Sequence, residues 1–158
     1  MKIRYYNRTR LPINVEDQFG ATYCGSLHEL LSTSDVVSVN CPLNAQTTDL
    51  ISRAEFATMK DGVYFVNTAR GPIVNEAALI EALESGKVCR AGLDVFDGEP
   101  GINEYFRTSH RCIIQPHLGG LTDAAFRRAE TECFENIKSF FETGRPVAPV
   151  NEVCKQSL

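Results

Sequence analysis

Short β-rich segments alternate with helical segments along this chain, and this alternation constrains the fold more than any other feature of the sequence. Apolar runs that favour strands occur at residues 35–40, 63–67, 88–96 and 112–115, and most are separated by a segment with helical spacing. Strands that alternate with helices form βαβ units, in which helices cover a parallel sheet on both faces. The sequence therefore predicts an α/β fold, a parallel three-layer sandwich.

Polar caps and glycine stops mark the expected helices. Gly20, Gly86 and Gly144 follow three of the helical segments. Shorter strands are expected at residues 3–6 and 21–24. The longest helix is expected to end near residue 143. The expected cap residues are Asn14, Ser26, Ser52, Asn75 and Thr122.

Composition argues against several classes of protein. The 158 residues carry a net charge of −4 without a basic stripe, which argues against nucleic acid as a partner. No apolar run approaches the roughly 20 residues that span a bilayer, and no secretory signal is recognisable, so we expect a soluble cytoplasmic protein without a membrane partner. The six cysteines are widely spaced and include no CxxC pair, which predicts reduced thiols in the core and no metal site.

Ligands bind at the carboxyl ends of the strands in an open parallel sheet, so the residues after each strand are candidates for a functional site. Arg70 follows the strand at 63–67, and Gly71 beside it allows a tight turn. A guanidinium at this edge can hold a carboxylate through two parallel hydrogen bonds. The alternative is that Arg70 is a solvated loop residue, as most single arginines are.

Two further strand ends carry candidates for acid–base chemistry. Asp94 lies within an apolar strand, where it needs a hydrogen-bond partner, and Glu99 lies in the loop beyond it. His117 follows the next strand and can donate a proton near neutral pH, which a neighbouring carboxylate favours. Taken singly, Glu99 could be a surface carboxylate and His117 a structural histidine. Together with Arg70, they supply the groups that the reduction of a 2-oxo acid requires.

Two long motifs resemble those of the D-isomer-specific 2-hydroxyacid dehydrogenases: "MKDGVYFVNTARGPIVNEAALIEALESGKVCRAGLDVFDGEP" and the later "QPHLGG". The resemblance extends from the first strand to about Asn151. It implies a Rossmann-type dinucleotide-binding fold. It also implies an oxidoreductase that transfers hydride between NAD(P)H and a small 2-oxo acid, of the glyoxylate or hydroxypyruvate type.

The resemblance implies a role for each residue that matches the family's motifs. Arg70 matches the arginine that binds the substrate's carboxylate and 2-oxo group. His117 matches the acid/base that protonates the carbonyl oxygen, and Glu99 matches the carboxylate that keeps this histidine protonated. Asp94 matches the residue that orients the nicotinamide carboxamide. Since the formate dehydrogenase branch lacks this glutamate, formate is not an expected substrate.

Cofactor contacts are implied along the same edge of the sheet. The loop "CPLNAQT" resembles the one that lines the nicotinamide-side ribose, with Thr47 matching its threonine. The full set of expected cofactor contacts is Asn7, Arg8, Thr9, Cys41, Pro42, Thr47, Thr68, Ala69, Arg70, Asp94, His117, Gly119 and Gly120.

The opening stretch "MKIRYYNRTR" resembles the second strand of the dinucleotide fold, whose end meets the adenosine ribose. Enzymes that prefer NAD usually carry an acidic residue there, and this chain has Asn7 instead. Without the carboxylate a 2′-phosphate is not repelled, and Arg8 with Thr9 can hydrogen-bond it. We therefore expect NADP rather than NAD. The alternative is that Arg8 and Arg10 are exposed loop cations.

The glycine-rich G-x-G-x-x-G loop of this fold does not occur in these 158 residues, so we expect the first strand and its loop to be missing. Residues 1–144 would form a partial dinucleotide-binding domain, and 145–158 a tail that in the family returns to the substrate domain. The strands at 3–6 and 35–40 would then pair directly or leave exposed edges. By analogy with the family we expect a homodimer. The alternative to an enzyme is a truncated, non-catalytic module for cofactor binding or dimerisation.

Overall fold

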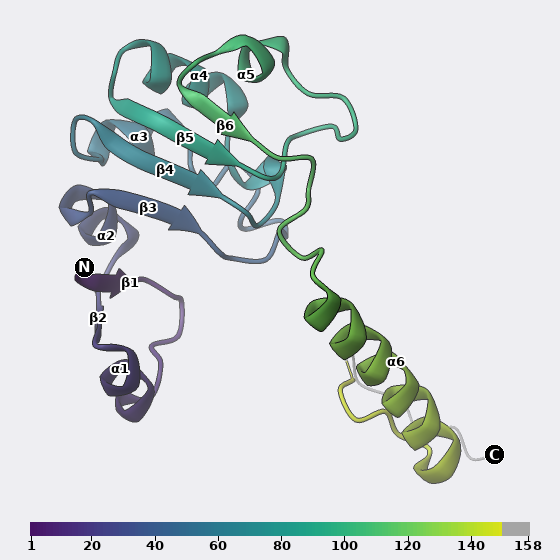
Figure 1. The fold of residues 1–158 in the computed structure, drawn as a ribbon. Helices are drawn as coiled ribbons and strands as arrows, with labels where there is room; N and C mark the ends of the chain where they lie inside the picture. Colours follow the sequence, from purple (N-terminus) through teal and green to yellow (C-terminus); the bar gives the residue numbers. More distant parts are fainter. Residues whose placement is uncertain (150–158) are drawn as a thin grey trace. The chain divides into compact units, whose positions relative to one another are not determined.

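The computed structural model describes residues 1–149, which form two compact units. The first unit comprises Met1–His117, and the second begins at Leu118. The first contains two parallel sheets with their helices, and the second is built on one long helix (Figure 1). Most of the expected tail at 145–158 lies outside the described residues, as does Cys154. The expected domain limits therefore stay predictions.

Strands and helices alternate through the first unit, as the sequence predicts. In chain order its elements are β1 (Ile3–Tyr5), α1 (Ile13–Phe19), β2 (Ala21–Tyr23), α2 (Leu27–Thr33), β3 (Val36–Val39), α3 (Arg53–Thr58), β4 (Val63–Asn67), the 3₁₀ helix η1 (Gly71–Ile73), α4 (Glu76–Glu84), β5 (Val88–Leu93), α5 (Glu104–Thr108) and β6 (Cys112–Ile114). Helix α6 (Asp123–Thr143) belongs to the second unit.

A parallel sheet of four strands, in the order β3-β4-β5-β6, forms the body of the first unit. Side chains on one face of this sheet are buried, with Phe65 fully buried. Helices α2 to α5 pack on this face and contribute to a single core, through Leu31, Phe56, Leu79, Leu83 and Phe106. The predicted parallel α/β arrangement is confirmed.

The opposite face of this sheet carries exposed side chains. Val36, Tyr64 and Ile113 project from β3, β4 and β6 on this side, and all three are exposed. The helices of the first unit thus cover one face of the four-stranded sheet, whereas the sequence pattern predicts cover on both.

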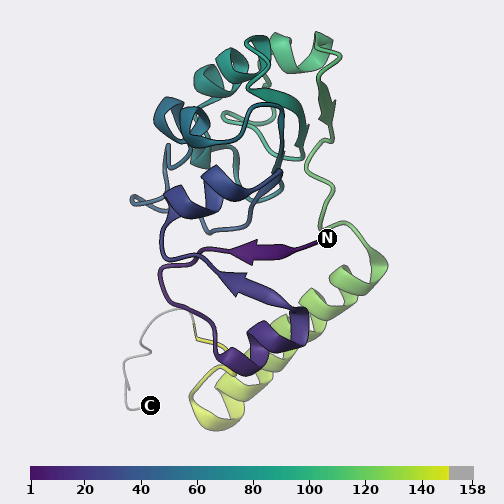
Figure 2. The same cartoon turned by 90° about the vertical axis from the view of Figure 1, so that its left-hand side faces the viewer.

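Strands β1 and β2 form a separate parallel sheet, and α1 connects them. Figure 2 shows these two purple strands side by side and pointing the same way. The two expected alternatives are direct pairing of β1 with β3 and exposed strand edges. In the described part of the chain β1 does not pair with β3, and each of these two strands keeps one unpaired edge. A doubly wound sheet has the strand order 3-2-1-4-5-6. Strands β2 and β1 of this chain correspond to strands 3 and 2 of that order, and β3, β4 and β5 correspond to strands 4, 5 and 6.

Polar residues stand at the starts of four helices where the sequence predicts caps, and before α3 the Ser52 N–H donates to the Glu55 carboxylate at 3.0 Å. The Ser26 hydroxyl accepts a hydrogen bond from the Glu29 N–H at 3.0 Å, and the Asn75 carbonyl oxygen accepts one from the Ala78 N–H at 3.0 Å. Thr122 caps α6 in the same way. These caps satisfy N–H groups that the first turn of a helix leaves without partners.

Two boundaries and one helix differ from the prediction. Helix α1 begins at Ile13 after Pro12, so the expected cap Asn14 lies inside the helix. Strand β5 ends at Leu93 rather than at residue 96, because the chain turns into a loop at Asp94. The short helix α5 was not predicted, since its five residues are too few for a clear helical repeat.

Helix α6 carries apolar side chains at helical spacing, yet none of its residues is buried. Among them Phe126, Ile137 and Phe140 are exposed. In the described part of the chain no helix is both long enough and apolar enough to cross a membrane. The five described cysteines are free thiols. The expected core location holds for Cys24, which is fully buried, and is wrong for Cys133, which is exposed.

Candidate active site at the carboxyl edge of the sheet

The loop that carries Arg70 is shaped by the buried side chain of Asn67, the last residue of β4. The Asn67 amide oxygen accepts a hydrogen bond from the Ala69 N–H at 3.0 Å, and its NH₂ group donates to the Arg70 carbonyl at 3.0 Å. Asn67 is only 2% exposed, so these bonds satisfy a polar group inside the core. The backbone of the loop is therefore fixed, while the Arg70 side chain is exposed at its tip.

A close backbone approach joins this loop to the one after β5. A Cβ atom on Gly71 would lie 2.0 Å from the carbonyl carbon of Phe96 and 2.4 Å from the Asp97 nitrogen. Only glycine fits such a contact. The Asp94 N–H also donates to the Asn67 carbonyl at 3.0 Å, which continues the pairing of β4 with β5. Arg70 and Glu99 are thus carried on two loops that touch through their backbones.

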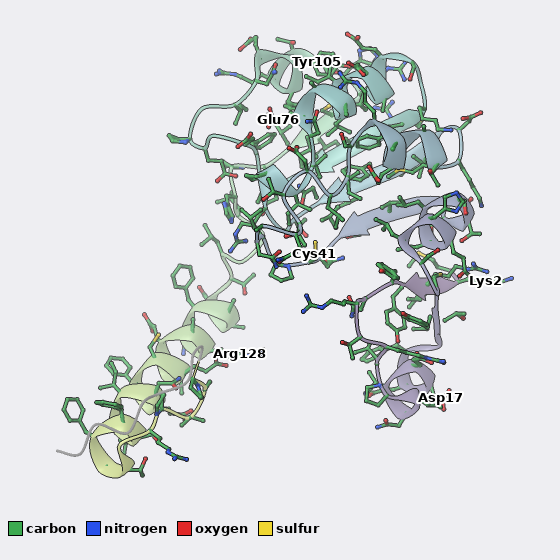
Figure 3. The ribbon with its side chains drawn as sticks, turned by 180° about the vertical axis from the view of Figure 1, so that it is seen from behind. Lys2, Asp17, Cys41, Glu76, Tyr105 and Arg128 are labelled. Carbon is green, nitrogen blue, oxygen red and sulfur yellow. The ribbon has the colours of Figure 1, made fainter. Side chains whose placement is uncertain are left out.

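Two carboxylates hold the loop after β5. The Phe96 N–H donates to Oε1 of Glu99 at 2.7 Å, and the Asp97 N–H donates to Oε1 of Glu76 at 2.9 Å. Partial burial raises the pKa of the Glu76 carboxyl above its usual value, and the nearby Asp97 charge adds to this. Glu76 is the first residue of α4, so this helix start supports the loop that bears Glu99 (Figure 3).

Glu99 and His117 form a hydrogen-bonded pair. Oε2 of Glu99 lies 2.8 Å from Nδ1 of His117, and the side chains are 32% and 47% exposed, respectively. The hydrogen bond from His117, aided by the Phe96 N–H, lowers the pKa of the Glu99 carboxyl. Glu99 is therefore a carboxylate at neutral pH and fixes the orientation of the imidazole, whose other nitrogen, Nε2, can transfer a proton.

His117 has a backbone φ of +56°, in the left-handed region that non-glycine residues seldom adopt. It follows β6, whose extension is marked by the bond from the Gln115 N–H to the Leu93 carbonyl at 2.9 Å. This unusual conformation occurs at the proposed proton donor, as strained backbone often does at functional sites.

The loop after β3 contains the next group of expected cofactor contacts. Cys41 is half-buried there, and burial raises the pKa of its thiol (Figure 3). The Thr47 hydroxyl donates to the Pro42 carbonyl at 2.7 Å and accepts from the Asn44 N–H at 2.8 Å. Thr47 therefore holds this loop closed on itself.

Asn7, Arg8 and Thr9 are exposed in the loop after β1. The Tyr23 hydroxyl donates to the Asn7 carbonyl at 3.3 Å, which ties the start of this loop to β2. No acidic side chain occurs between Asn7 and Pro12. The role of these residues in binding a 2′-phosphate stays a prediction.

The structure brings some of the expected residues into contact and leaves others apart. Glu99 and His117 meet directly, whereas the Arg70 guanidinium donates to the neighbouring Ala69 carbonyl. Of the remaining expected cofactor contacts, Thr68 is exposed, Ala69 half-buried and Asp94 buried, and Gly119 and Gly120 belong to the second unit.

Sequence reasoning missed two residues that shape the site, Asn67 and Glu76. An amide at the end of the apolar run "VYFVN" was the available signal for Asn67, because a buried polar side chain needs partners. Glu76 gave no such signal, since an acidic residue in the first turn of a helix is common without any further role.

Residues 1–119 match the family model described as D-isomer specific 2-hydroxyacid dehydrogenase, NAD binding domain. Over 155 aligned residues, the chain is 59% identical to the dehydrogenase efuE of Hormonema carpetanum. This alignment covers 98% of this chain and 39% of the relative.

Two solved structures are similar over nearly the whole chain. A glyoxylate reductase from Paecilomyes thermophila has 44% identity and a TM-score of 0.90, with 95% of this chain and 45% of that chain covered. The holo form of D-mandelate dehydrogenase from Rhodotorula graminis has 39% identity and a TM-score of 0.93, with 99% and 46% covered. The chain thus spans less than half the length of each of these proteins.

Proposed function

Because this chain belongs to the D-isomer-specific 2-hydroxyacid dehydrogenase family, we propose that it supplies the acid/base and cofactor-binding portion of an oxidoreductase that reduces a small 2-oxo acid with NADPH. The proposed substrates are of the glyoxylate or hydroxypyruvate type. The names of similar proteins support this class of substrate, and the positions of Glu99, His117 and Arg70 support the chemistry.

The Glu99–His117 pair is the observation that carries the proposal. Oε2 of Glu99, 2.8 Å from Nδ1, fixes the orientation of the ring and leaves Nε2 available for proton transfer. His117 then donates a proton from Nε2 to the oxygen of the substrate's 2-oxo group, so that this oxygen becomes the hydroxyl of the product. Glu99 stabilises the charge of the imidazolium until the proton leaves.

Arg70 is the proposed clamp for the substrate's carboxylate. Its exposed guanidinium follows β4, and its backbone is fixed by Asn67. A planar guanidinium can hold a carboxylate through two parallel bonds, which sets the orientation of the neighbouring carbonyl carbon. We propose that the 2-oxo group is then oriented toward His117.

The nucleotide supplies the hydride when it is bound, and the described residues fit a nucleotide with a 2′-phosphate. Arg8 is exposed in the loop after β1, no acidic residue lies between Asn7 and Pro12, and the nearby Glu16 carboxylate is paired with Arg10. Asp94, Cys41 and Thr47 follow the ends of β5 and β3, where the nicotinamide side of the cofactor would lie. We therefore propose NADP in preference to NAD.

A chimeric enzyme tests this function. The chain replaces the matching part of the Paecilomyes thermophila glyoxylate reductase, which supplies the other half, and NADPH oxidation is followed with glyoxylate and with hydroxypyruvate. We expect turnover that falls by about 10²–10⁴-fold in His117→Asn, because the proton donor is lost. His110→Asn is the matched control, since His110 is exposed and the Glu99–His117 pair does not involve it.

A folded chimera without turnover would contradict the proposed function, and so would a His117→Asn chimera that keeps the parent's rate. Circular dichroism and the thermal transition show whether each variant is folded.

The proposed assembly is a homodimer, and the proposed domain limits are residues 1–144 and 145–158. Light scattering coupled to gel filtration tests the assembly, since a dimer has twice the mass of the chain.

A further inference from the structure

We propose that Arg10 is a positioning residue for recognition of the nucleotide's 2′-phosphate, because it pairs with Glu16 and Tyr5 to hold the loop that presents Arg8 and Thr9. This inference rests on the proposed preference for NADP. It assigns the two arginines of "NRTR" different tasks, Arg8 as the ligand of the phosphate and Arg10 as its support.

Arg10 is already occupied by a carboxylate of its own chain. Its Nε and one terminal nitrogen donate to the two oxygens of Glu16, each at 2.8 Å, in a bidentate pair. The Glu16 side chain is only 8% exposed and also accepts a hydrogen bond from the Tyr5 hydroxyl at 2.6 Å. These bonds lower the pKa of the Glu16 carboxyl to about 2, so the pair stays charged at neutral pH.

The same cluster fixes both ends of the loop. The Leu11 N–H donates to the Tyr5 hydroxyl at 2.9 Å, and the Tyr23 hydroxyl donates to the Asn7 carbonyl at 3.3 Å. The Arg10 guanidinium also lies over the Tyr23 ring, 5.4 Å from its centre. Arg8 and Thr9 lie between these two anchored points.

Arg8 differs from Arg10 in having no hydrogen-bond or ion-pair partner among residues 1–149. Its cationic group is therefore free to bind an anion, whereas Arg10 would have to leave a nearly buried carboxylate unpaired. A preorganised loop loses less conformational freedom when the ligand binds, which raises affinity for the group that the loop contacts. The cluster thus acts on specificity for the 2′-phosphate, with no contact of its own to the phosphate.

Binding to the 158-residue chain tests the proposal without any turnover. Affinities for 2′,5′-ADP and 5′-AMP are measured by titration calorimetry, and their ratio reports recognition of the 2′-phosphate. We expect Arg10→Lys and Tyr5→Phe each to lower this ratio by roughly threefold to tenfold, as loss of one or two charge-assisted bonds implies. The affinity for 5′-AMP should stay within about twofold, since it lacks the group that the loop positions.

Arg53→Lys is the matched control. Arg53 forms the other bidentate pair of the described chain, with Glu81, and joins α3 to α4. This variant should leave the ratio unchanged. Hydrogen exchange of the amides at residues 8–11 gives a second measurement, and it should be faster in Tyr5→Phe and in Arg10→Lys than in the parent.

The outcomes separate the two proposals. In one outcome, the parent chain prefers 2′,5′-ADP and the Arg8→Ala variant loses this preference, but Arg10→Lys and Tyr5→Phe both keep it. This outcome would overturn the positioning role of Arg10 and leave the NADP assignment standing. A parent chain without any preference for the 2′-phosphorylated nucleotide would overturn both.

Discussion

At the scale of single residues, the site depends on contacts that tolerate no extra atoms. Gly71 stands where the Arg70 loop meets the backbone of Phe96, and a Cβ there would lie 2.0 Å from a backbone carbon. Neither backbone can withdraw easily, because one is held by Asn67 and the other by Glu76. The steric requirement therefore belongs to both loops together.

We expect Gly71→Ala to lower the free energy of unfolding by about 3 kcal/mol, at the upper end of the cost of overpacking. Urea denaturation measures this change. Gly92→Ala is the matched control, because its added Cβ would be 3.9 Å from the nearest atom, a side-chain carbon of Val66. The control should change stability by less than about 1 kcal/mol. Equal effects at both glycines would rule out the close contact.

Glu16 predicts a dependence of stability on pH. Its carboxyl has a pKa of about 2 in the folded chain, below its ordinary value of 4.5, because Arg10 and Tyr5 hydrogen-bond its charged form. A lowered pKa means that this stabilisation is complete above the ordinary value and is lost as the pH falls toward 2. We expect the stability difference between the parent and Glu16→Gln to shrink between pH 6 and pH 3 in urea denaturation. A constant difference would contradict this.

Arg70, Glu99 and His117 could be predicted singly because each follows an apolar run, and the carboxyl ends of parallel strands share one edge. The contact between Glu99 and His117 could not be predicted from spacing alone. It depends on a loop conformation held by the Phe96 and Asp97 N–H groups, which no side-chain pattern encodes. Asn67 was missed for the same reason, because its partners are backbone atoms.

At the scale of elements, the helix starts show which sequence signals decide a boundary. Asn75 caps α4 as predicted, whereas Asn14 lies inside α1, which begins directly after Pro12. Pro12 stands directly before the helix with an extended ψ of 144°, and its carbonyl accepts hydrogen bonds from the N–H groups of Val15 and Glu16. Pro12 therefore marks the start of α1, and the prediction that Asn14 caps this helix is wrong.

We expect Asn75→Ala to lower the free energy of unfolding by about 1 kcal/mol, as loss of a capping bond usually does. The side chain accepts from the Ala78 N–H at 3.0 Å and donates to Asp49 at 3.2 Å, and both bonds are lost. Asn14→Ala is the control, since this residue is exposed within α1, and the change should stay below about 0.5 kcal/mol. Thermal denaturation of both variants checks this, and the reverse order of effects would contradict it.

At the scale of the whole molecule, the two sheets of the first unit differ in how much they bury. The four-stranded sheet packs on one continuous core, whereas Glu16 and Cys24 are the only buried residues before α2. The alternation of strands and helices could predict the parallel class, because it follows from the chain's own periodicity. The alternation could not predict that the helices of this unit cover only one face of the four-stranded sheet. Which face a helix covers depends on tertiary packing and not on the periodicity of a segment.

We expect backbone amides of β1 and β2 to exchange with solvent at least about tenfold faster than those of β4 and β5. A two-stranded sheet with few buried contacts opens locally at low cost, while strands at the centre of a core open only with the whole unit. Hydrogen–deuterium exchange with peptide-level mass spectrometry measures this. Equal protection of the two sheets would contradict it.

The strand order β3-β4-β5-β6 also has a consequence for how the site is made during synthesis. Each new strand joins an edge formed by the strand before it, so the sheet can grow in step with the emerging chain and needs no distant partner. His117 follows β6, the last strand to be added. A chain interrupted before β6 therefore carries Glu99 without its hydrogen-bond partner His117, and the pair cannot form.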